Sequence, residues 1–126
     1  MLDKFQHLYD IVKKLRAPDG CPWDREHTAA EFAADAGEEA AELIEAFGGG
    51  NNADIEEEWG DVLFVLLATA AAAEDEGRFT LRDAIEKAHD KMIRRHEHVF
   101  GDTKASSPDD AINRWNQVKA RERNEK

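Results

Sequence analysis

Apolar residues recur every three or four positions along most of the 126-residue chain, which is the spacing of amphipathic α-helices. No segment alternates apolar and polar residues for long enough to predict a β-strand. The predicted helices run from about Leu2 to Arg16, from Thr28 to the glycines at 48–50, from Asp54 to Gly77, from Thr80 to about Gly101, and from Ser107 onwards. The pattern therefore predicts an all-α fold, an antiparallel bundle of about five helices that forms a single domain over residues 1–126.

Capping signals mark several of the expected helix ends. Thr28 and Glu31 have the spacing of a capping box, and Asp54 is a plausible N-cap for the third helix. Ser107 precedes a proline, which is favoured at the first position of a helix. Two prolines and a glycine between residues 17 and 24 end the first helix.

The third helix is unusual because its second half is apolar on every side. The run from Val62 to Ala73 is interrupted only by Thr69. It is much shorter than the roughly 20 residues that a membrane-spanning helix needs, so it predicts a buried helix and no membrane partner. A chain this small has few helices with which to surround it, so we predict that a second copy completes the bundle, in a homodimer or homotetramer.

Charge is distributed unevenly along the chain. The formal net charge is −11, which argues against a protein that coats nucleic acid through Lys and Arg. Residues 26–77 hold 15 of the 28 acidic residues and no Lys or Arg. The single cysteine, Cys21, cannot form an internal disulfide, and the N-terminal residues lack the layout of a secretory signal, so a cytoplasmic location is expected.

Two carboxylate pairs lie within this base-free stretch. Residues three apart share a helix face, which pairs Glu39 with Glu42 on the second predicted helix and Glu58 with Asp61 on the third. The loop between these helices is short enough to make them antiparallel neighbours. Four carboxylates without His or Cys suit a hard divalent cation, Mg²⁺ or Mn²⁺. The alternative is a solvated acidic face, which is what most Glu-rich helix surfaces are.

Basic residues gather later in the chain. Lys91 and Arg95 are one turn apart on the fourth predicted helix, and Lys119 lies one turn beyond Trp115 on the fifth. A metal held by acids opposite a basic surface is the arrangement that binds a polyphosphate. The alternative is that these cations only complement the dipole at a helix C-terminus.

In this order, the motifs resemble those of the MazG nucleoside triphosphate pyrophosphohydrolases. The resemblance spans nearly the whole chain and rests on Gly20-Cys21-Pro22-Trp23-Asp24, Glu38-Glu39-x-x-Glu42, Glu58-x-x-Asp61, Lys91-x-x-Arg94-Arg95-His96-x-His98 and Trp115-x-x-x-Lys119. It implies paired all-α chains that hydrolyse a nucleoside triphosphate (NTP) to the monophosphate and pyrophosphate, an activity suited to removing non-standard nucleotides. The sequence departs from the family pattern at Gly37, Ala41 and Glu97, which affects the expected substrate preference.

The resemblance also implies roles for individual residues. Mg²⁺ would be bound by Glu39, Glu42, Glu58 and Asp61. Glu38 would orient or deprotonate the attacking water, and the phosphates and base would be bound by Lys91, Arg95, Trp115 and Lys119. Two alternatives remain open: a narrower hydrolase acting on dUTP or a phosphoribosyl nucleotide, and a non-catalytic acidic helical dimer that binds divalent ions or a basic partner.

Overall fold

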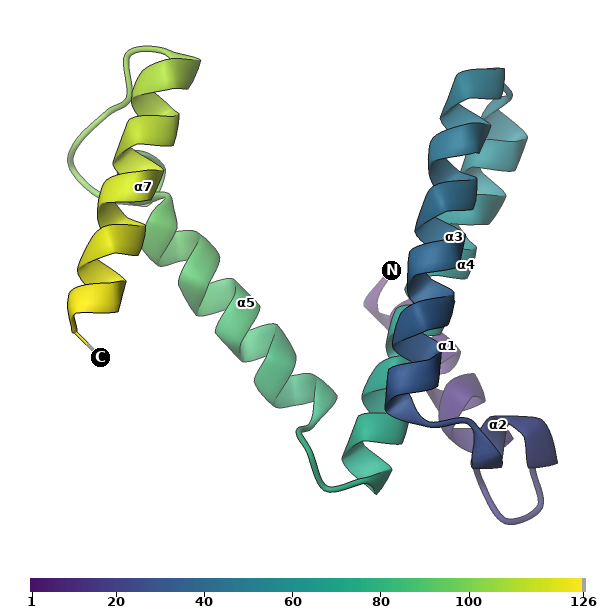
Figure 1. Ribbon diagram of the computed structural model, residues 1–126. Coiled ribbons are helices and arrows are strands. Elements are labelled where there is room, and N and C mark those ends of the chain that lie inside the picture. The colour runs from purple at the N-terminus through teal and green to yellow at the C-terminus, as the bar shows by residue number, and fades with distance from the viewer. Residues whose placement is uncertain (126) are drawn as a thin grey trace. The chain divides into compact units, whose positions relative to one another are not determined.

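The computed structural model describes residues 1–125, and within them the chain forms seven helices and no strand (Figure 1). The all-α prediction is therefore confirmed. The helices divide into two compact units, residues 1–81 and the residues from Arg82 onwards, and each unit is described by itself. Among the described residues, no helix is both long enough and apolar enough to cross a membrane.

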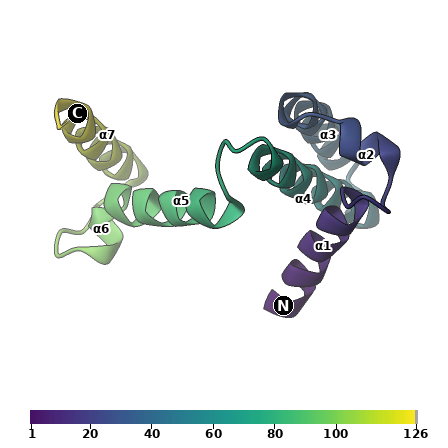
Figure 2. The same cartoon turned by 90° about the horizontal axis from the view of Figure 1, so that it is seen from below.

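The first unit is built around a long antiparallel helix pair. Its helices are α1 (Leu2–Leu15), α2 (Pro22–Glu26), α3 (Ala29–Gly49) and α4 (Asn52–Asp75). Helices α3 and α4 lie side by side, and α1 packs at an angle against α4 (Figures 1 and 2). Gly50, which joins α3 to α4, has a φ of 75°, a left-handed conformation that favours glycine at a helix C-terminus.

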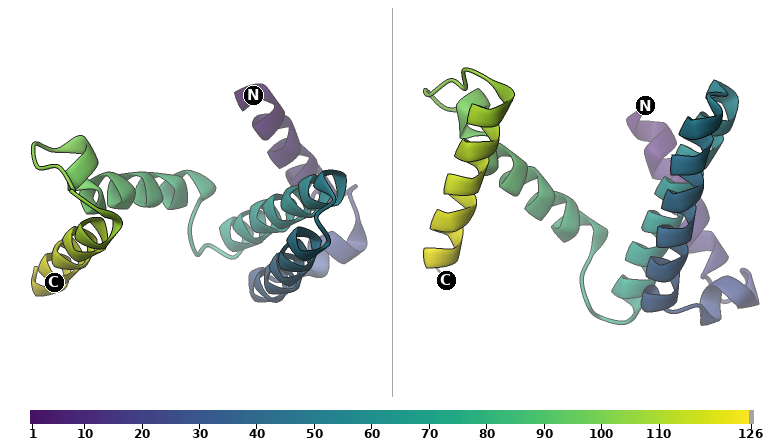
Figure 3. Two further views of the ribbon diagram at one scale, coloured as in Figure 1. Left: turned by 90° about the horizontal axis from the view of Figure 1, so that it is seen from above. Right: turned by 45° about the horizontal axis from the view of Figure 1, so that its top comes forward.

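The second unit contains α5 (Leu81–Arg95, whose first residue belongs to the first unit), α6 (Glu97–Phe100) and α7 (Pro108–Asn124). The C-terminal end of α5 lies beside α7 (Figure 3). Val118 of α7 is buried, whereas Ile112 on the same helix is 58% exposed, because α7 has few neighbours within this unit.

The capping predictions were confirmed at two helices and wrong at a third. The Thr28 hydroxyl accepts a hydrogen bond from the Glu31 amide, and the Glu31 carboxylate accepts one from the Thr28 amide, which completes the capping box. The Ser107 hydroxyl likewise accepts from the Asp110 amide. Helix α4, however, begins earlier than predicted, because the side chain of Asn51 rather than Asp54 caps it.

Two short helices were not predicted. Helix α2 lies in the segment that we expected to be irregular, where Pro22 occupies the first helical turn and so initiates a helix instead of ending one. The helix that we expected to continue to Gly101 stops at Arg95, because His96 leaves the helical conformation with φ −106° and ψ 40°. The carbonyl oxygen of Met92 is bonded both by the His96 ring, at 2.7 Å, and by the His96 amide, at 3.0 Å.

The apolar half of α4 lies in the core of the first unit. Its buried residues, Leu67, Ala68, Ala71, Ala72 and Ala73, pack with Tyr9, Val12, Ala29 and Phe32. Helices α1 and α3 therefore already cover much of the surface for which we invoked a second copy. Leu66 on α4 remains 51% exposed, so a second copy is needed to cover only this remaining part of the apolar surface of α4.

Candidate functional site

Helices α3 and α4 bring three carboxylates together. Glu39 projects from α3, and Glu58 and Asp61 project from α4. One ligand oxygen from each lies within 4.8 Å of the other two. The antiparallel pairing and the three-residue spacing on α4 thus produce the convergence expected from the sequence.

Two of these carboxylates have an oxygen that lacks a partner. Oε2 of Glu39 and Oε2 of Glu58 are buried and accept no hydrogen bond from any described residue. A buried carboxylate oxygen without a donor or cation is costly, so such atoms are rare in folded proteins. The site therefore needs positive charge that the described residues do not supply.

The pKa shifts of the cluster also indicate that the site needs positive charge. Burial raises the pKa of the Glu39 carboxyl, and the adjacent carboxyl of Glu42 raises it further. The pKa of Glu58 is raised by the same two causes, burial and then the charge on Glu42. Close negative charges disfavour the ionised form of each carboxyl, and a cation between them would reverse that effect.

Glu42 lies beside this cluster and opens onto a hollow. Its charge acts on both Glu39 and Glu58, although it does not belong to the group of oxygens within 4.8 Å. The hollow has a volume of about 470 Å³ and is lined by Glu42, Glu45, Ala46, Gly49, Asn51, Asp54 and Glu58. Sequence reasoning missed Glu45 and Asp54 here. The signal was available for Glu45, which continues the three-residue spacing from Glu39 through Glu42.

Glu38 is exposed on α3 and is not among the converging oxygens. As the residue before Glu39, it points about 100° away around the helix. This position leaves its carboxylate free to face solvent next to the cluster.

The donor set fits a hard divalent cation. Glu39, Glu58 and Asp61 offer only carboxylate oxygens, which suit Mg²⁺ and Mn²⁺ better than zinc. The two buried oxygens without hydrogen bonds are the atoms that such a cation would satisfy.

The other predicted site residues all lie in the second unit. Lys91 and Lys119 are exposed, and neither forms an ion pair with a described residue. Lys91 lines a hollow of about 540 Å³ together with Lys87 and Arg94. Arg95, in contrast, is largely buried: it is paired with Glu122, and its guanidinium carbon lies 5.1 Å from the centre of the Trp115 ring.

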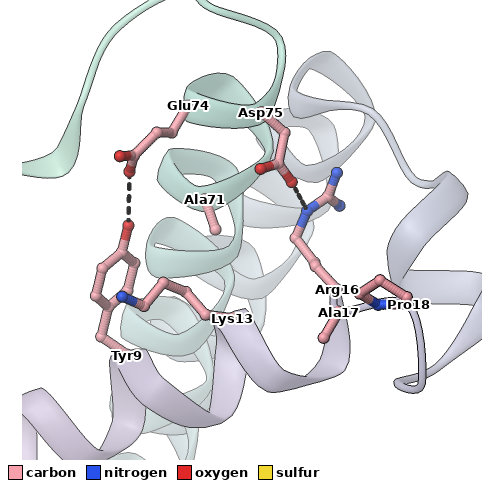
Figure 4. A pocket seen from close by; sticks show the side chains of 8 residues that line it. All are labelled: Tyr9, Lys13, Arg16, Ala17, Pro18, Ala71, Glu74 and Asp75. Atoms are coloured by element: carbon pink, nitrogen blue, oxygen red, sulfur yellow. Dashed lines mark hydrogen bonds and ion pairs between the residues drawn. The ribbon is translucent and has the colours of Figure 1, made fainter.

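A second hollow of the first unit, between α1 and the end of α4, has paired charges (Figure 4). The Tyr9 hydroxyl donates to Glu74 at 3.2 Å, and Arg16 Nε donates to Asp75 at 2.9 Å. The same Arg16 side chain donates from Nη1 to the carbonyl oxygens of Asp24 and His27. Arg16 therefore links α2 and the residue that follows it to α4.

The Gly-Cys-Pro-Trp-Asp motif spans the end of the loop before α2 and the first turn of α2, and its contacts are structural. A Cβ atom at Gly20 would collide with the carbonyl oxygens of Lys14 and Leu15, so only glycine fits. The Cys21 amide bonds the Leu15 carbonyl at 2.8 Å, and Trp23 stacks on His27 with ring centres 4.2 Å apart. The motif thus packs α2 against the rest of the unit.

Comparison with known proteins gives one consistent result. Residues 28–100 match the model of the MazG nucleotide pyrophosphohydrolase domain. A nucleoside triphosphate pyrophosphohydrolase/pyrophosphatase MazG of Thermotoga maritima is 42% identical over 97% of this chain and 46% of its own length. A nucleoside triphosphate pyrophosphohydrolase of Escherichia coli is 38% identical over 99% of this chain and 48% of its own length. The chain therefore spans about half the length of these curated relatives.

The fold also has a solved counterpart. The crystal structure of a mazG-related protein from Thermotoga maritima superposes with a TM-score of 0.78 and is 28% identical, covering 91% of this chain and 98% of the other.

Proposed function

This chain belongs to the MazG nucleotide pyrophosphohydrolase family, and we propose that it hydrolyses nucleoside triphosphates to the monophosphate and pyrophosphate with bound Mg²⁺. The observation that carries this proposal is the convergence of Glu39, Glu58 and Asp61, with two buried oxygens that lack hydrogen bonds. We assign Glu42 to the same site because its charge acts on two of these residues. All four acids lie inside the segment that matches the family.

Each step of the proposed reaction is assigned to particular residues of the chain. When bound, the divalent ion supplies a water of lowered pKa and neutralises phosphate oxygens. Glu38, exposed beside the cluster, orients the water that attacks phosphorus and accepts its proton. Lys91, Lys119 and Arg95 neutralise the charge that develops on the pyrophosphate leaving group.

Trp115 is assigned to the nucleobase. It lines a hollow of about 370 Å³ whose other side chains include His98, Ile112 and Asn116. An aromatic face with an adjacent amide suits a flat heterocycle that carries hydrogen-bonding groups. The activity as a whole is suited to clearing non-standard nucleotides.

We also propose that the active form is a homodimer or homotetramer. Helices α3 and α4 of the first unit expose large apolar side chains, which include Ile44 at 72%, Phe47 at 63% and Trp59 at 57%. Such a concentration of exposed apolar surface favours contact with another chain, and a second copy is the partner always present.

The proposal is tested with a panel of NTPs and deoxy-NTPs, with and without Mg²⁺, scored for released pyrophosphate. Turnover that requires Mg²⁺ and is lost in Glu39→Gln supports it. Turnover of dUTP or a phosphoribosyl nucleotide alone would indicate a narrower hydrolase. Mg²⁺ binding without turnover of any substrate would indicate a non-catalytic acidic protein.

A further inference from the structure

Glu122 on α7 holds two arginines of α5 at once. Its Oε1 accepts hydrogen bonds from Nε and Nη2 of Arg95, at 3.1 and 2.9 Å. Its Oε2 accepts a hydrogen bond from Nε of Arg94. None of the roles assigned above includes Glu122.

The pairing with Arg95 is shielded from water. The side chains of Arg95 and Glu122 are only 14% and 16% exposed, whereas that of Arg94 is 49% exposed. An ion pair that is largely removed from solvent and doubly hydrogen-bonded keeps a fixed geometry, unlike a mobile surface pair. The guanidinium of Arg95 is therefore held in one orientation.

Trp115 fixes the same guanidinium from another direction. The Arg95 guanidinium carbon lies 5.1 Å from the centre of the Trp115 ring, within the range of a cation–π contact. Trp115, Lys119 and Glu122 are four and three residues apart on α7, so they share one helix face. Among the described residues, the hydrogen bonds of Arg95 come only from Nε and Nη2, which leaves Nη1 available.

We propose that Glu122 is a positioning residue for nucleotide binding: it holds Arg95 against Trp115 with Nη1 available for a phosphate oxygen. The inference rests on the proposed function, in which Arg95 binds phosphate. Glu122 acts through Arg95 and does not itself touch the substrate.

A purely electrostatic role of Glu122 and a positioning role predict opposite changes in KM, so the direction of the change distinguishes them. Removing the carboxylate would leave two guanidinium groups uncompensated, and greater positive charge attracts a polyphosphate more strongly. A simple electrostatic role thus predicts a lower KM in Glu122→Gln. A positioning role predicts a KM about tenfold higher, because the substrate must then order a mobile arginine, and a kcat that falls no further than in Arg95→Ala.

The experiment compares KM and kcat for an NTP in the unsubstituted protein, Glu122→Gln, Glu122→Asp and a matched control. The control is Glu86→Gln, which removes the carboxylate from the exposed ion pair of Glu86 with Arg82. We expect a raised KM in Glu122→Gln, partial recovery in Glu122→Asp and no change in Glu86→Gln. The Nε–H NMR signal of Arg95 should be protected from solvent exchange in the unsubstituted protein and lose that protection in Glu122→Gln.

A double-substitution cycle tests whether the effect passes through Arg95. In an Arg95→Ala background, Glu122→Gln should change KM no further. An unchanged or lowered KM in Glu122→Gln, or additive effects in the cycle, would overturn the inference while leaving the proposed function intact. No turnover by the unsubstituted protein would instead overturn the proposed function. If Glu122→Gln does not fold, Glu122→Asp decides the matter: a KM equal to that of the unsubstituted protein overturns the inference.

Discussion

Replacing Glu39 by Gln should stabilise the metal-free protein and at the same time abolish its stabilisation by Mg²⁺. Gln keeps the shape of the side chain and removes one negative charge from the cluster. The ligand oxygens of Glu39 and Asp61 lie within 4.8 Å of each other. At that separation, two unit charges repel by about 0.9 kcal/mol at the dielectric constant of water and by about 3.5 kcal/mol at an effective value of 20.

The lower of these values applies, because Asp61 is exposed and Glu39 is only half-buried. We therefore expect Glu39→Gln to stabilise the metal-free protein by about 1 kcal/mol, which raises the Tm by about 4 °C for a chain of this length. In the unsubstituted protein, Mg²⁺ at a hundred times its Kd should add about 2.7 kcal/mol, or about 10 °C.

The assay is thermal unfolding followed by circular dichroism, in chelator and across a Mg²⁺ titration. Glu56→Gln is the matched control, since it removes one exposed carboxylate of α4 that does not belong to the converging group. It should leave the Mg²⁺ response intact. A full Mg²⁺ response in Glu39→Gln would refute the metal assignment, and a lower Tm in its metal-free form would refute the repulsion argument.

Three further outcomes are expected. Glu38→Gln should lower kcat by roughly 10²–10⁴-fold, the usual contribution of a general base, yet keep the Mg²⁺-dependent rise in Tm; loss of both would make Glu38 a ligand. Gly20→Ala should lower the free energy of unfolding, measured in denaturant, by about 1–3 kcal/mol, because the added Cβ meets backbone oxygens. Gly37→Ala has open space around the added Cβ, so it should raise the free energy of unfolding by about 0.5–1 kcal/mol through the greater helix propensity of alanine in α3. Arg95 and Arg94 lower the pKa of Glu122 to about 2. The stability that the ionised Glu122 contributes is therefore present above about pH 4.5 and is lost as the pH falls towards 2. Unfolding curves of Glu122→Gln and the unsubstituted protein should therefore converge near pH 2, and a constant difference would contradict the pairing.

The parts of the fold that could be predicted from sequence depend on local chemistry. The bonds at Thr28 and Ser107 form between residues three apart, so a short motif contains all the information needed. The break at His96 could not be predicted in this way. No proline or glycine lies within four residues of it, and the break consists of the backbone conformation of His96 itself, which no short motif announces.

The candidate site shows the same division between local and long-range information. The spacing of Glu58 and Asp61 predicts a shared face, and the short connection after Gly50 places Glu39 opposite them. The spacing could not predict that Glu39 and Glu58 would each have a buried oxygen without a hydrogen bond. Burial depends on the packing of whole helices, which the sequence pattern describes only coarsely.

Arg95 is the clearest example of information that only the structure supplies. Its spacing from Lys91 is typical of an exposed phosphate-binding pair, yet its guanidinium is largely buried against Trp115 and Glu122. Those two partners follow it by 20 and 27 residues and lie outside the matched segment 28–100. If Arg95 binds phosphate, its orientation depends on α7, so the functional unit extends beyond the residues that match the family. The two curated relatives described above align with 97% and 99% of this chain, so the alignments extend beyond the matched segment into α7.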